Sequence, residues 1–249
     1  MSKPPRFFIL SEQISGTQIF IAGEDVHHIT TVLRMVPGRL LILCDGKGME
    51  YTVRIAKVGR TEVITEIQSE AKRGPFYPRI VLGQGLPKAE KMDFIVQKAT
   101  ELGVESIVPL VTERTIIKIK DGQKRVTRWQ KICREAAMQS NRIDIPKVTS
   151  ITPFRNFIMT LEPEPFTLNL LPWEEESRRI KGVLQNHQGI NKVNVLIGPE
   201  GGFSIAEVKI AMAREFNLVS LGPNILRTET AAVSVLSIIG YEYHRDVGR

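Results

Sequence analysis

The sequence predicts an α/β protein in which a small β-barrel precedes a parallel sheet covered by helices. Two observations support this fold class. The first 70 or so of the 249 residues carry short β-rich segments separated by turn signals, and short strands at close spacing are typical of a small barrel. After residue 72, apolar strands alternate with helical segments, which indicates a parallel sheet with helices on both faces. We therefore expect two domains, residues 1–72 and residues 73–249.

The N-terminal part is expected to contain several strands and one helical turn. Strands are expected at Phe7–Leu10, Gln18–Ile21, Leu40–Leu43, Tyr51–Ile55 and Glu62–Ile67, with a helical turn at Asp25–Leu33. Glycine- and proline-bearing turns separate them, and Lys72-Arg73-Gly74-Pro75 ends the pattern.

In the C-terminal part, strands are expected at Arg79–Gln84, Ser106–Val111, Phe166–Leu170, Val193–Ile197 and Leu218–Leu221. Helices are expected at Lys88–Leu102, Lys124–Gln139, Glu174–Leu184, Ser204–Phe216 and Ala231–Tyr243. A further helix is expected to begin at Thr152-Pro153, with Pro153 at its first position. The final helix is apolar on nearly all faces, so it either fills a core or seals a subunit contact.

Composition indicates a soluble globular protein, with 42% hydrophobic and 24% charged residues. No apolar run approaches the roughly 20 residues that a membrane span needs, and the N-terminus does not resemble a signal peptide. The two cysteines are far apart, and no cysteine or histidine spacing suits a metal, so we expect reduced thiols, no metal and a cytoplasmic location. The net charge of +7 favours a polyanionic partner such as nucleic acid, although charge alone fits an ordinary basic protein equally well.

The strand ending at Ile197 runs into the glycine-rich stretch Gly198-Pro199-Glu200-Gly201-Gly202-Phe203. A buried strand, a glycine-rich turn and a helix form the place where α/β sheets bind ligands. Ser204 and Glu207 match a capping box at the start of that helix. The alternative is an ordinary tight turn, but a carboxylate at Glu200 is an unusual structural choice there. Because that carboxylate would repel a phosphate, the stretch does not suit a nucleotide-phosphate cradle.

A second stretch, Leu221 to Thr230, lies between the last strand and the last helix. Ile225 and Leu226 are apolar residues in a loop, where they could form walls for a flat aromatic ligand. Arg227 and Glu229 follow, and Glu229 could hold the Arg227 guanidinium in a bidentate pair. The alternative is a loop packed on the core with a surface ion pair of little energetic value.

A third stretch, Arg134 to Arg142, places a polar cluster at the end of a helix, where it could hydrogen-bond a base or a phosphate. Motifs of other enzyme classes are missing. The sequence has no Walker A motif and no GxSxG, and Gly83-Gln84-Gly85 lacks the third glycine of GxGxxG because position 88 is lysine.

Together these stretches resemble the bacterial 16S rRNA uracil-N3 methyltransferases, of the SPOUT (α/β-knot) superfamily. The resemblance covers nearly the whole chain in order, and the segments Gly198–Gly202 and Ile225–Ala231 are the most specific; Thr115, where the family favours serine, is a small departure. The other matching segments are His28 with Val32-Leu33-Arg34 and Gly38, Lys88, Gln97–Val104, Pro109, Thr112-Glu113-Arg114, Glu135–Ala137, Gln139-Ser140, Arg142, Ile197, Phe203 and Leu221-Gly222.

The resemblance implies S-adenosylmethionine as cofactor, a PUA-like barrel that binds RNA, and a SPOUT domain with a deep trefoil knot, a rare exception to unknotted chains. It implies a homodimer, and 3-methyluridine in 16S rRNA near the decoding region as product, within the 30S subunit or its late precursor.

Site residues follow from these stretches and from the resemblance, which adds Arg34, Lys88 and Arg114. Cofactor-binding residues are expected at Leu196, Ile197, Gly198, Pro199, Glu200, Gly201, Gly202, Leu221, Gly222, Ile225, Leu226, Thr230 and Ala231. RNA-binding residues are expected at Arg34, Lys88, Arg114, Gln139 and Arg142. Catalytic candidates are Arg227, Glu229, Glu200 and Arg142, with Arg227 first as a stabiliser of negative charge and the base left open between Glu200 and Glu229. The rival functions are methylation of a ribose 2′-hydroxyl or of tRNA, and RNA binding without catalysis.

Overall fold

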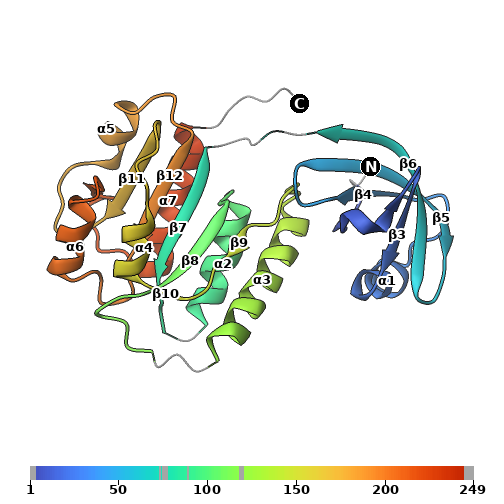
Figure 1. The fold of residues 1–249 in the computed structure, drawn as a ribbon, viewed down its shortest axis with the longest axis horizontal. Coiled ribbons are helices and arrows are strands. Elements are labelled where there is room, and N and C mark those ends of the chain that lie inside the picture. The colour runs from blue at the N-terminus through green and yellow to red at the C-terminus, as the bar shows by residue number, and fades with distance from the viewer. Residues whose placement is uncertain (1–3, 73, 75–77, 89, 118–120, 244–249) are drawn as a thin grey trace. The chain divides into compact units, whose positions relative to one another are not determined.

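The computed structural model describes residues 4–72, 74, 78–88, 90–117 and 121–243. The chain divides into two compact units, and both the α/β class and the order of a β-rich part before a parallel sheet are confirmed (Figure 1). The first unit comprises Met1–Gly74 together with Ala137–Ile145, and the second comprises Pro75–Ala136 and Pro146–Arg249. Three residues named in the expected elements lie outside the described residues. They are Arg73 and Pro75 at the expected domain break and Ala89 in the expected helix Lys88–Leu102.

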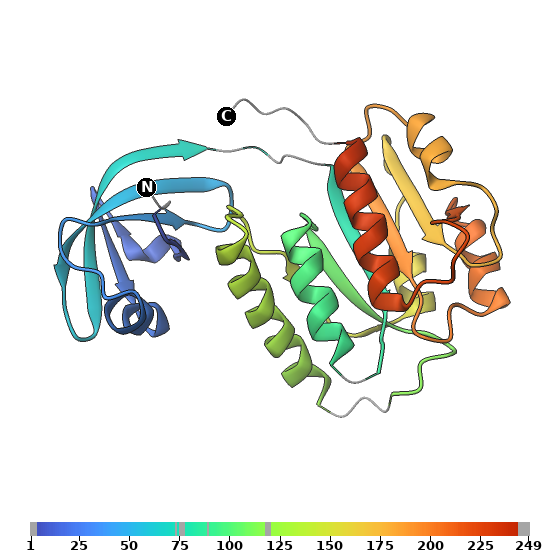
Figure 2. The ribbon, with the colours of Figure 1, turned by 180° about the vertical axis from the view of Figure 1, so that it is seen from behind.

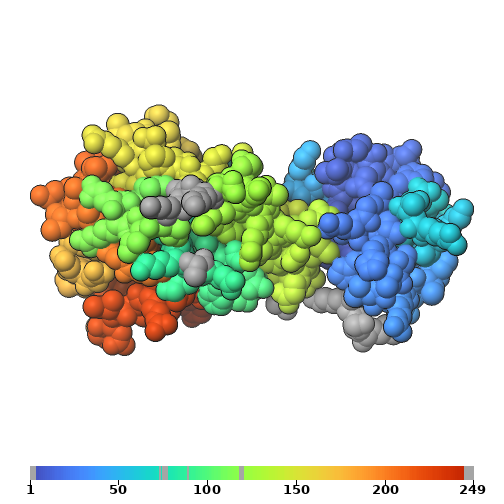
Figure 3. All heavy atoms as spheres, turned by 90° about the horizontal axis from the view of Figure 1, so that it is seen from below, coloured from blue at the N-terminus to red at the C-terminus, as the bar shows by residue number. Residues whose placement is uncertain are grey.

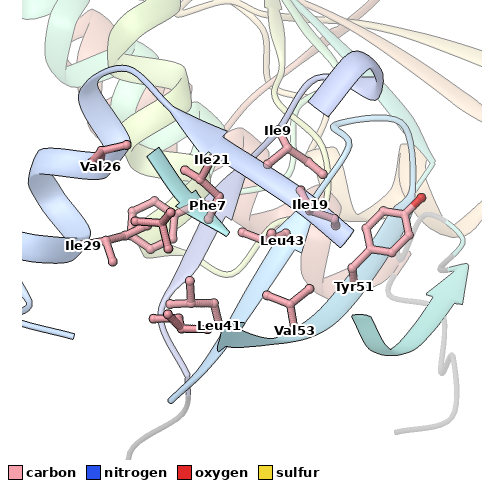
Figure 4. Close-up of a cluster of buried hydrophobic side chains, with 12 residues drawn as sticks. Phe7, Ile9, Ile19, Ile21, Val26, Ile29, Leu41, Leu43, Tyr51 and Val53 are labelled. Carbon is pink, nitrogen blue, oxygen red and sulfur yellow. The ribbon is translucent and has the colours of Figure 1, made fainter. Parts of the chain in front are cut away.

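The first unit is a six-stranded sheet in the order β1-β4-β5-β6-β3-β2. Its strands are β1 (Arg6–Phe8), β2 (Ile14–Ser15), β3 (Gln18–Ala22), β4 (Leu40–Cys44), β5 (Met49–Val58) and β6 (Glu62–Lys72). The sheet encloses a core to which Phe7, Ile19, Leu43 and Val53 contribute (Figure 4). Between strands lie a 3-10 turn (Ser11–Gln13), α1 (Glu24–His27) and a π-helical turn (His28–Val32). The helical turn expected at Asp25–Leu33 is therefore present.

The segment Ala137–Ile145 belongs to the first unit, which the sequence did not predict. Its apolar side chains pack with Phe8 and Cys44. Beside them Arg6 donates to Glu50 Oε2 and to Cys44 Sγ, each at 2.7 Å. Burial raises the pKa of the Cys44 thiol to about 11, although Arg6 opposes the shift, so the thiol is protonated at neutral pH. Cys44 is a free, buried cysteine.

The second unit contains a wholly parallel sheet in the order β10-β8-β7-β12-β11-β13, with β9 paired to β8. Its strands are β7 (Arg79–Gly85), β8 (Ser106–Val111), β9 (Lys147–Val148), β10 (Thr152–Pro153), β11 (Thr167–Pro172), β12 (Lys192–Ile197) and β13 (Asn217–Val219). Its helices are α2 (Lys91–Glu101), α3 (Gly122–Gln139), α4 (Phe154–Thr160), α5 (Ile180–Gln185), α6 (Ile205–Met212) and α7 (Thr228–Glu242).

Helices cover both faces of this sheet. On one face α2 and α7 lie side by side (Figure 2), and α3 lies beside α2 (Figures 2 and 3). The Asp93 carboxylate joins α2 to α3 by accepting hydrogen bonds from Arg128 and Trp129. On the other face Phe157 of α4 and Val208 of α6 pack on the strands in one apolar core. Among the described residues, no helix has the length and apolar character needed to cross a bilayer.

Several helix boundaries differ from those expected; α6, for example, ends at Met212 rather than Phe216. Thr152-Pro153 is a strand, and Pro153 precedes α4; β10 lies at the sheet edge, where the missing N–H of proline removes no ladder bond. The charged stretch from Glu174 onward is helical only at Ile180–Gln185. Helix α7 begins at Thr228 rather than Ala231, which places Arg227 at its N-cap.

Candidate functional site

A pocket of about 400 Å³ lies where β11, β12 and β13 end, on the carboxyl side of the parallel strands. This is the edge at which open α/β sheets bind ligands, and the volume is in the usual range for a small molecule. Two loops form most of its wall: the first loop (198–203) after β12 and the second loop (220–227) between β13 and α7. The remaining lining residues are Lys91, Pro172, Trp173, Glu174, Ile197, Thr228 and Ala231.

The first loop folds tightly because of its glycines. A Cβ on Gly198 would lie 2.9 Å from the carbonyl carbon of Gly202 and 3.1 Å from the nitrogen of Phe203, so any side chain there would force the loop open. Gly202 has φ +67°, a left-handed conformation that favours glycine. The expected capping box is formed: Ser204 Oγ accepts from the Glu207 N–H at 3.2 Å, and Glu207 Oε2 accepts from the Ser204 N–H at 2.9 Å.

A neighbouring turn supports the outer side of the first loop. Arg114 Nη1 donates to the carbonyl oxygen of Gly201 at 2.6 Å, and the Glu113 N–H donates to Glu207 Oε1 at 3.0 Å. Arg114, expected to bind RNA, is thus exposed but also braces the pocket. Its contact with RNA stays a prediction.

Lys91 connects two carboxylates beside the pocket. Its Nζ lies 3.2 Å from Glu200 Oε1 and 3.4 Å from Glu229 Oε2, and the Lys88 N–H donates to Glu200 Oε1 at 3.0 Å. Burial alone would raise the pKa of Glu200, but hydrogen bonds from its own N–H, from Lys88 and from Lys91 outweigh burial and lower it. The hydrogen bond to Glu200 is the main cause that raises the pKa of Lys91. Glu200 is therefore an anion and Lys91 a cation at neutral pH.

The second loop brings Ile225, Leu226 and Arg227 to the pocket. Ile225 is 83% exposed, which is unusual for an isoleucine and suits an apolar surface that a bound ligand would cover. The expected pairing of Arg227 with Glu229 is wrong. Glu229 lies in the first turn of α7 and faces Lys91 of α2, while Arg227 precedes the helix with extended backbone. Within the described part of the chain, Arg227 forms no ion pair, and its side chain is exposed at the pocket.

Comparison with known proteins identifies the family. A model of the RNA methyltransferase domain matches residues 75–240, and a model of the RNA methyltransferase PUA domain matches residues 21–68. The chain belongs to the RNA methyltransferase family. It is 33% identical over 250 residues to the ribosomal RNA small subunit methyltransferase E of Bacillus subtilis (strain 168), covering 95% of this chain and 96% of the relative.

Two solved structures of similar proteins resemble this RNA methyltransferase over almost its whole length. One is a ribosomal RNA small subunit methyltransferase E from Neisseria gonorrhoeae bound to S-adenosylmethionine, with 30% identity, a TM-score of 0.87, and coverage of 97% of this chain and 98% of that one. The other is a Legionella pneumophila methyltransferase in complex with the same cofactor, with 31% identity, a TM-score of 0.85, and coverage of 96% and 98%.

Most of the expected cofactor residues of this RNA methyltransferase line the pocket: Ile197, Gly198, Pro199, Glu200, Gly202, Leu221, Gly222, Ile225, Leu226 and Ala231. Leu196, Gly201 and Thr230 do not. The Leu196 side chain is buried in the core under α4 and α6, and Thr230 is exposed on α7. Glu229 is also absent from the lining, because it lies against Lys91.

Sequence reasoning missed Trp173, Glu174 and Lys91. Trp173-Glu174 directly follows β11, so a systematic reading of every strand end would have found it. Lys91 also gave a signal, because lysine in the first turn of a helix opposes the helix dipole and therefore requires a compensating partner.

The other expected RNA-binding residues are not among the residues that line this pocket. Arg34 is exposed with φ +48°, and Gln139 is exposed at the end of α3. Arg142 is largely buried: it donates to Asp144 Oδ2 at 2.5 Å, and its carbonyl oxygen accepts from Arg6 at 3.4 Å. The lining residues of the pocket do not include Arg142, so its expected catalytic role has no support in the pocket geometry.

Proposed function

We propose that this RNA methyltransferase transfers a methyl group from S-adenosylmethionine to N3 of a uridine in 16S rRNA, giving 3-methyluridine. The observation that carries the proposal is the pocket between the two loops. It lies at the carboxyl end of the parallel sheet, within the part of the chain that matches the RNA methyltransferase domain. A relative that the chain resembles over nearly its full length is named a ribosomal RNA methyltransferase, and two similar solved structures contain bound S-adenosylmethionine.

The residues present suit this cofactor. Ile197, Ile225 and Leu226 offer apolar walls for the adenine ring, and the glycines of the first loop leave backbone groups open to its edge. The carboxylates of Glu174 and Glu200 complement the positive charge of the sulfonium and ammonium groups. When bound, the cofactor supplies an electrophilic methyl group.

The chemistry at uracil requires loss of the N3 proton, because the nitrogen lone pair is tied into the imide. Arg227 is the cation best placed to stabilise negative charge that develops on O2 or O4, since its guanidinium is exposed at the pocket and unpaired among the described residues. Glu200 reaches the pocket, but its lowered pKa makes it a weak base, and Glu229 lies behind Lys91. We therefore assign charge stabilisation to Arg227 and an electrostatic role to Glu200, with the N3 proton passing to solvent water.

We further propose that the second loop and α7 complete the trefoil knot of the SPOUT superfamily. After the edge strand β13, the chain returns to the middle of the sheet, where α7 packs against α2 and β12. The Thr228 hydroxyl then bonds the carbonyl oxygen of Gly198 at 2.6 Å. A knot forms only where the chain passes through an earlier loop, and this return brings the start of α7 beside the first loop.

A homodimer through α7 is the proposed assembly. Tyr241 is 88% exposed on α7 and Phe94 is 46% exposed on the neighbouring α2, so both large side chains lie on the same helical layer. Burying such aromatic residues is a major source of interface stability.

The first unit, with Arg34 exposed, is the proposed RNA-binding part, and the 30S subunit or its late precursor is the proposed substrate. A cytoplasmic location follows from that substrate.

Nucleoside analysis tests the proposed reaction. The protein is incubated with methyl-deuterated S-adenosylmethionine and either naked 16S rRNA or 30S subunits that lack the modification, and the digested nucleosides are separated by mass spectrometry. Deuterated 3-methyluridine is the expected product. A 2′-O-methylated nucleoside, a product on tRNA alone, or RNA binding with no transfer would each contradict the proposal and favour one of the rivals.

A further inference from the structure

The segment Gly83-Gln84-Gly85 at the end of β7 lies beneath the first loop. Gln84 is fully buried. Its Nε2 donates to Thr228 Oγ1 at 2.9 Å, to the carbonyl oxygen of Gly85 at 3.0 Å and, more weakly, to that of Gly198 at 3.4 Å. One buried amide thus joins β7 to the start of the first loop and to the start of α7.

The direction of each hydrogen bond is fixed by chemistry. The carbonyl oxygens of Gly85 and Gly198 only accept, so the amide nitrogen of Gln84, and not its oxygen, must face them. The Thr228 hydroxyl accepts from Gln84 and donates to the carbonyl oxygen of Gly198. Among the described residues, Gln84 Oε1 is buried without a hydrogen-bond partner, which is unfavourable. The orientation of the Gln84 amide is therefore set by its donor bonds to the pocket-forming segments.

The flanking glycines allow the close approach that this network needs. A Cβ on Gly85 would lie 2.6 Å from both the nitrogen and Cδ of Pro199, and one on Gly83 would lie 2.7 Å from Leu196 Cδ2. At Gly85 only glycine therefore lets the first loop approach β7 at this distance, whereas at Gly83 the neighbour is the end of the Leu196 side chain on the paired strand β12. Gly83 and Gly85 provide the space, and Gln84 provides the directional bonds.

We propose that Gln84 is a positioning residue that sets the separation between the first loop and the start of α7, and thereby the affinity of the pocket for its cofactor. The inference rests on the proposed function, since it takes the pocket to be the cofactor site. Gln84 is not among the pocket-lining residues, so its effect passes through Gly198 and Thr228, which are. Loss of the network lets the two walls of the pocket move apart.

Binding of S-adenosylhomocysteine, measured by calorimetry, tests the role of Gln84. Gln84→Met keeps the length of the side chain and removes its N–H donors. Without the Gln84 amide donor, the oxygens of Gly85, Gly198 and Thr228 each lose a hydrogen bond. The affinity for S-adenosylhomocysteine should therefore fall by about 5- to 150-fold. The matched control is Asn194→Leu, since Asn194 is also buried on neighbouring β12 but donates to Asn169 Oδ1 at 2.8 Å instead of to the pocket loops. It should lose thermal stability and keep its affinity.

Thr228 gives an independent pair of variants should Gln84→Met fail to fold. Thr228→Val removes the hydroxyl and should weaken binding, whereas Thr228→Ser keeps it and should restore affinity. The double variant Gln84→Met, Thr228→Val should bind no worse than the weaker single variant, because both changes break one network.

Three results would overturn the role of Gln84. These are normal affinity in a folded Gln84→Met protein, an equal loss in Asn194→Leu, and an equal loss in Thr228→Ser and Thr228→Val. A wild-type protein that binds no S-adenosylhomocysteine would instead overturn the proposed function itself, and the inference with it.

Discussion

Gly198→Ala is the sharpest perturbation of the proposed cofactor site. The new methyl group would lie 2.9 Å from the carbonyl carbon of Gly202, 3.0 Å from its Cα and 3.1 Å from the nitrogen of Phe203. All three neighbours are backbone atoms, so no side chain can rotate away. The φ of Gly198 is outside the left-handed region, so alanine fits the local backbone and the effect is purely steric.

The size of the effect follows from overpacking, which costs about 1–3 kcal/mol for an added methyl or methylene group. In the Gly198→Ala variant without cofactor, we expect the first loop to relieve the clash by opening toward solvent. The cofactor complex requires the closed loop, so the cost reappears as lost affinity. At 1.4 kcal/mol for each factor of ten, binding should weaken by about 5- to 140-fold.

Calorimetric titration with S-adenosylhomocysteine measures that loss. The control is Gly182→Ala on α5, where nothing lies within 4 Å of the new methyl group and alanine favours the helix. Gly182→Ala should bind normally and unfold at the same or a slightly higher temperature. Wild-type affinity in a folded Gly198→Ala protein would refute the claim that the closed first loop forms the cofactor site.

Three further outcomes are expected. Arg227→Ala should lower the single-turnover rate at saturating cofactor and RNA by about 10²–10³-fold with little change in cofactor affinity, because it acts on charge that appears in the transition state; a near-normal rate would remove it from catalysis. Arg34→Glu should weaken RNA binding in filter assays and flatten its salt dependence, since a phosphate contact is lost; an unchanged slope would exclude that contact. Tyr241→Glu should convert the dimer to monomer in sedimentation velocity; an unchanged sedimentation coefficient would place the interface elsewhere.

The substitution Arg34→Glu replaces the more obvious test, which is to remove residues 1–70. The segment Ala137–Ile145 packs on that part of the chain through Ala137 and Ile143. Removing the strands would expose these apolar side chains and perturb the end of α3, so a loss of RNA binding would have no single cause.

Features governed by local sequence could be predicted. The strand ending at Ile197, its glycine-rich turn and the capping box of Ser204 with Glu207 each depend on neighbouring residues, and the structure contains all three. The same holds for Ile225 and Leu226, whose apolar character in a loop pointed to the pocket wall.

Features governed by tertiary contacts could not be predicted. Glu229 is two residues from Arg227, yet it pairs with Lys91, 138 positions earlier in the chain, because α7 packs on α2. Gln84 looked like part of a failed dinucleotide motif, and only the crossing of Pro199 over Gly85 shows what the two glycines allow. Such partners are set by the topology of the fold, which cannot be deduced from a short stretch of sequence.

A crystal structure of the protein with S-adenosylhomocysteine would show directly whether the two loops hold the cofactor. We expect the ligand to lie between the first loop and the second loop, with its adenine against Ile225 and Leu226 and with the hydrogen bond from Thr228 to the Gly198 carbonyl oxygen intact. Ligand density at any other place on the second unit, or an opened first loop beside the ligand, would contradict it.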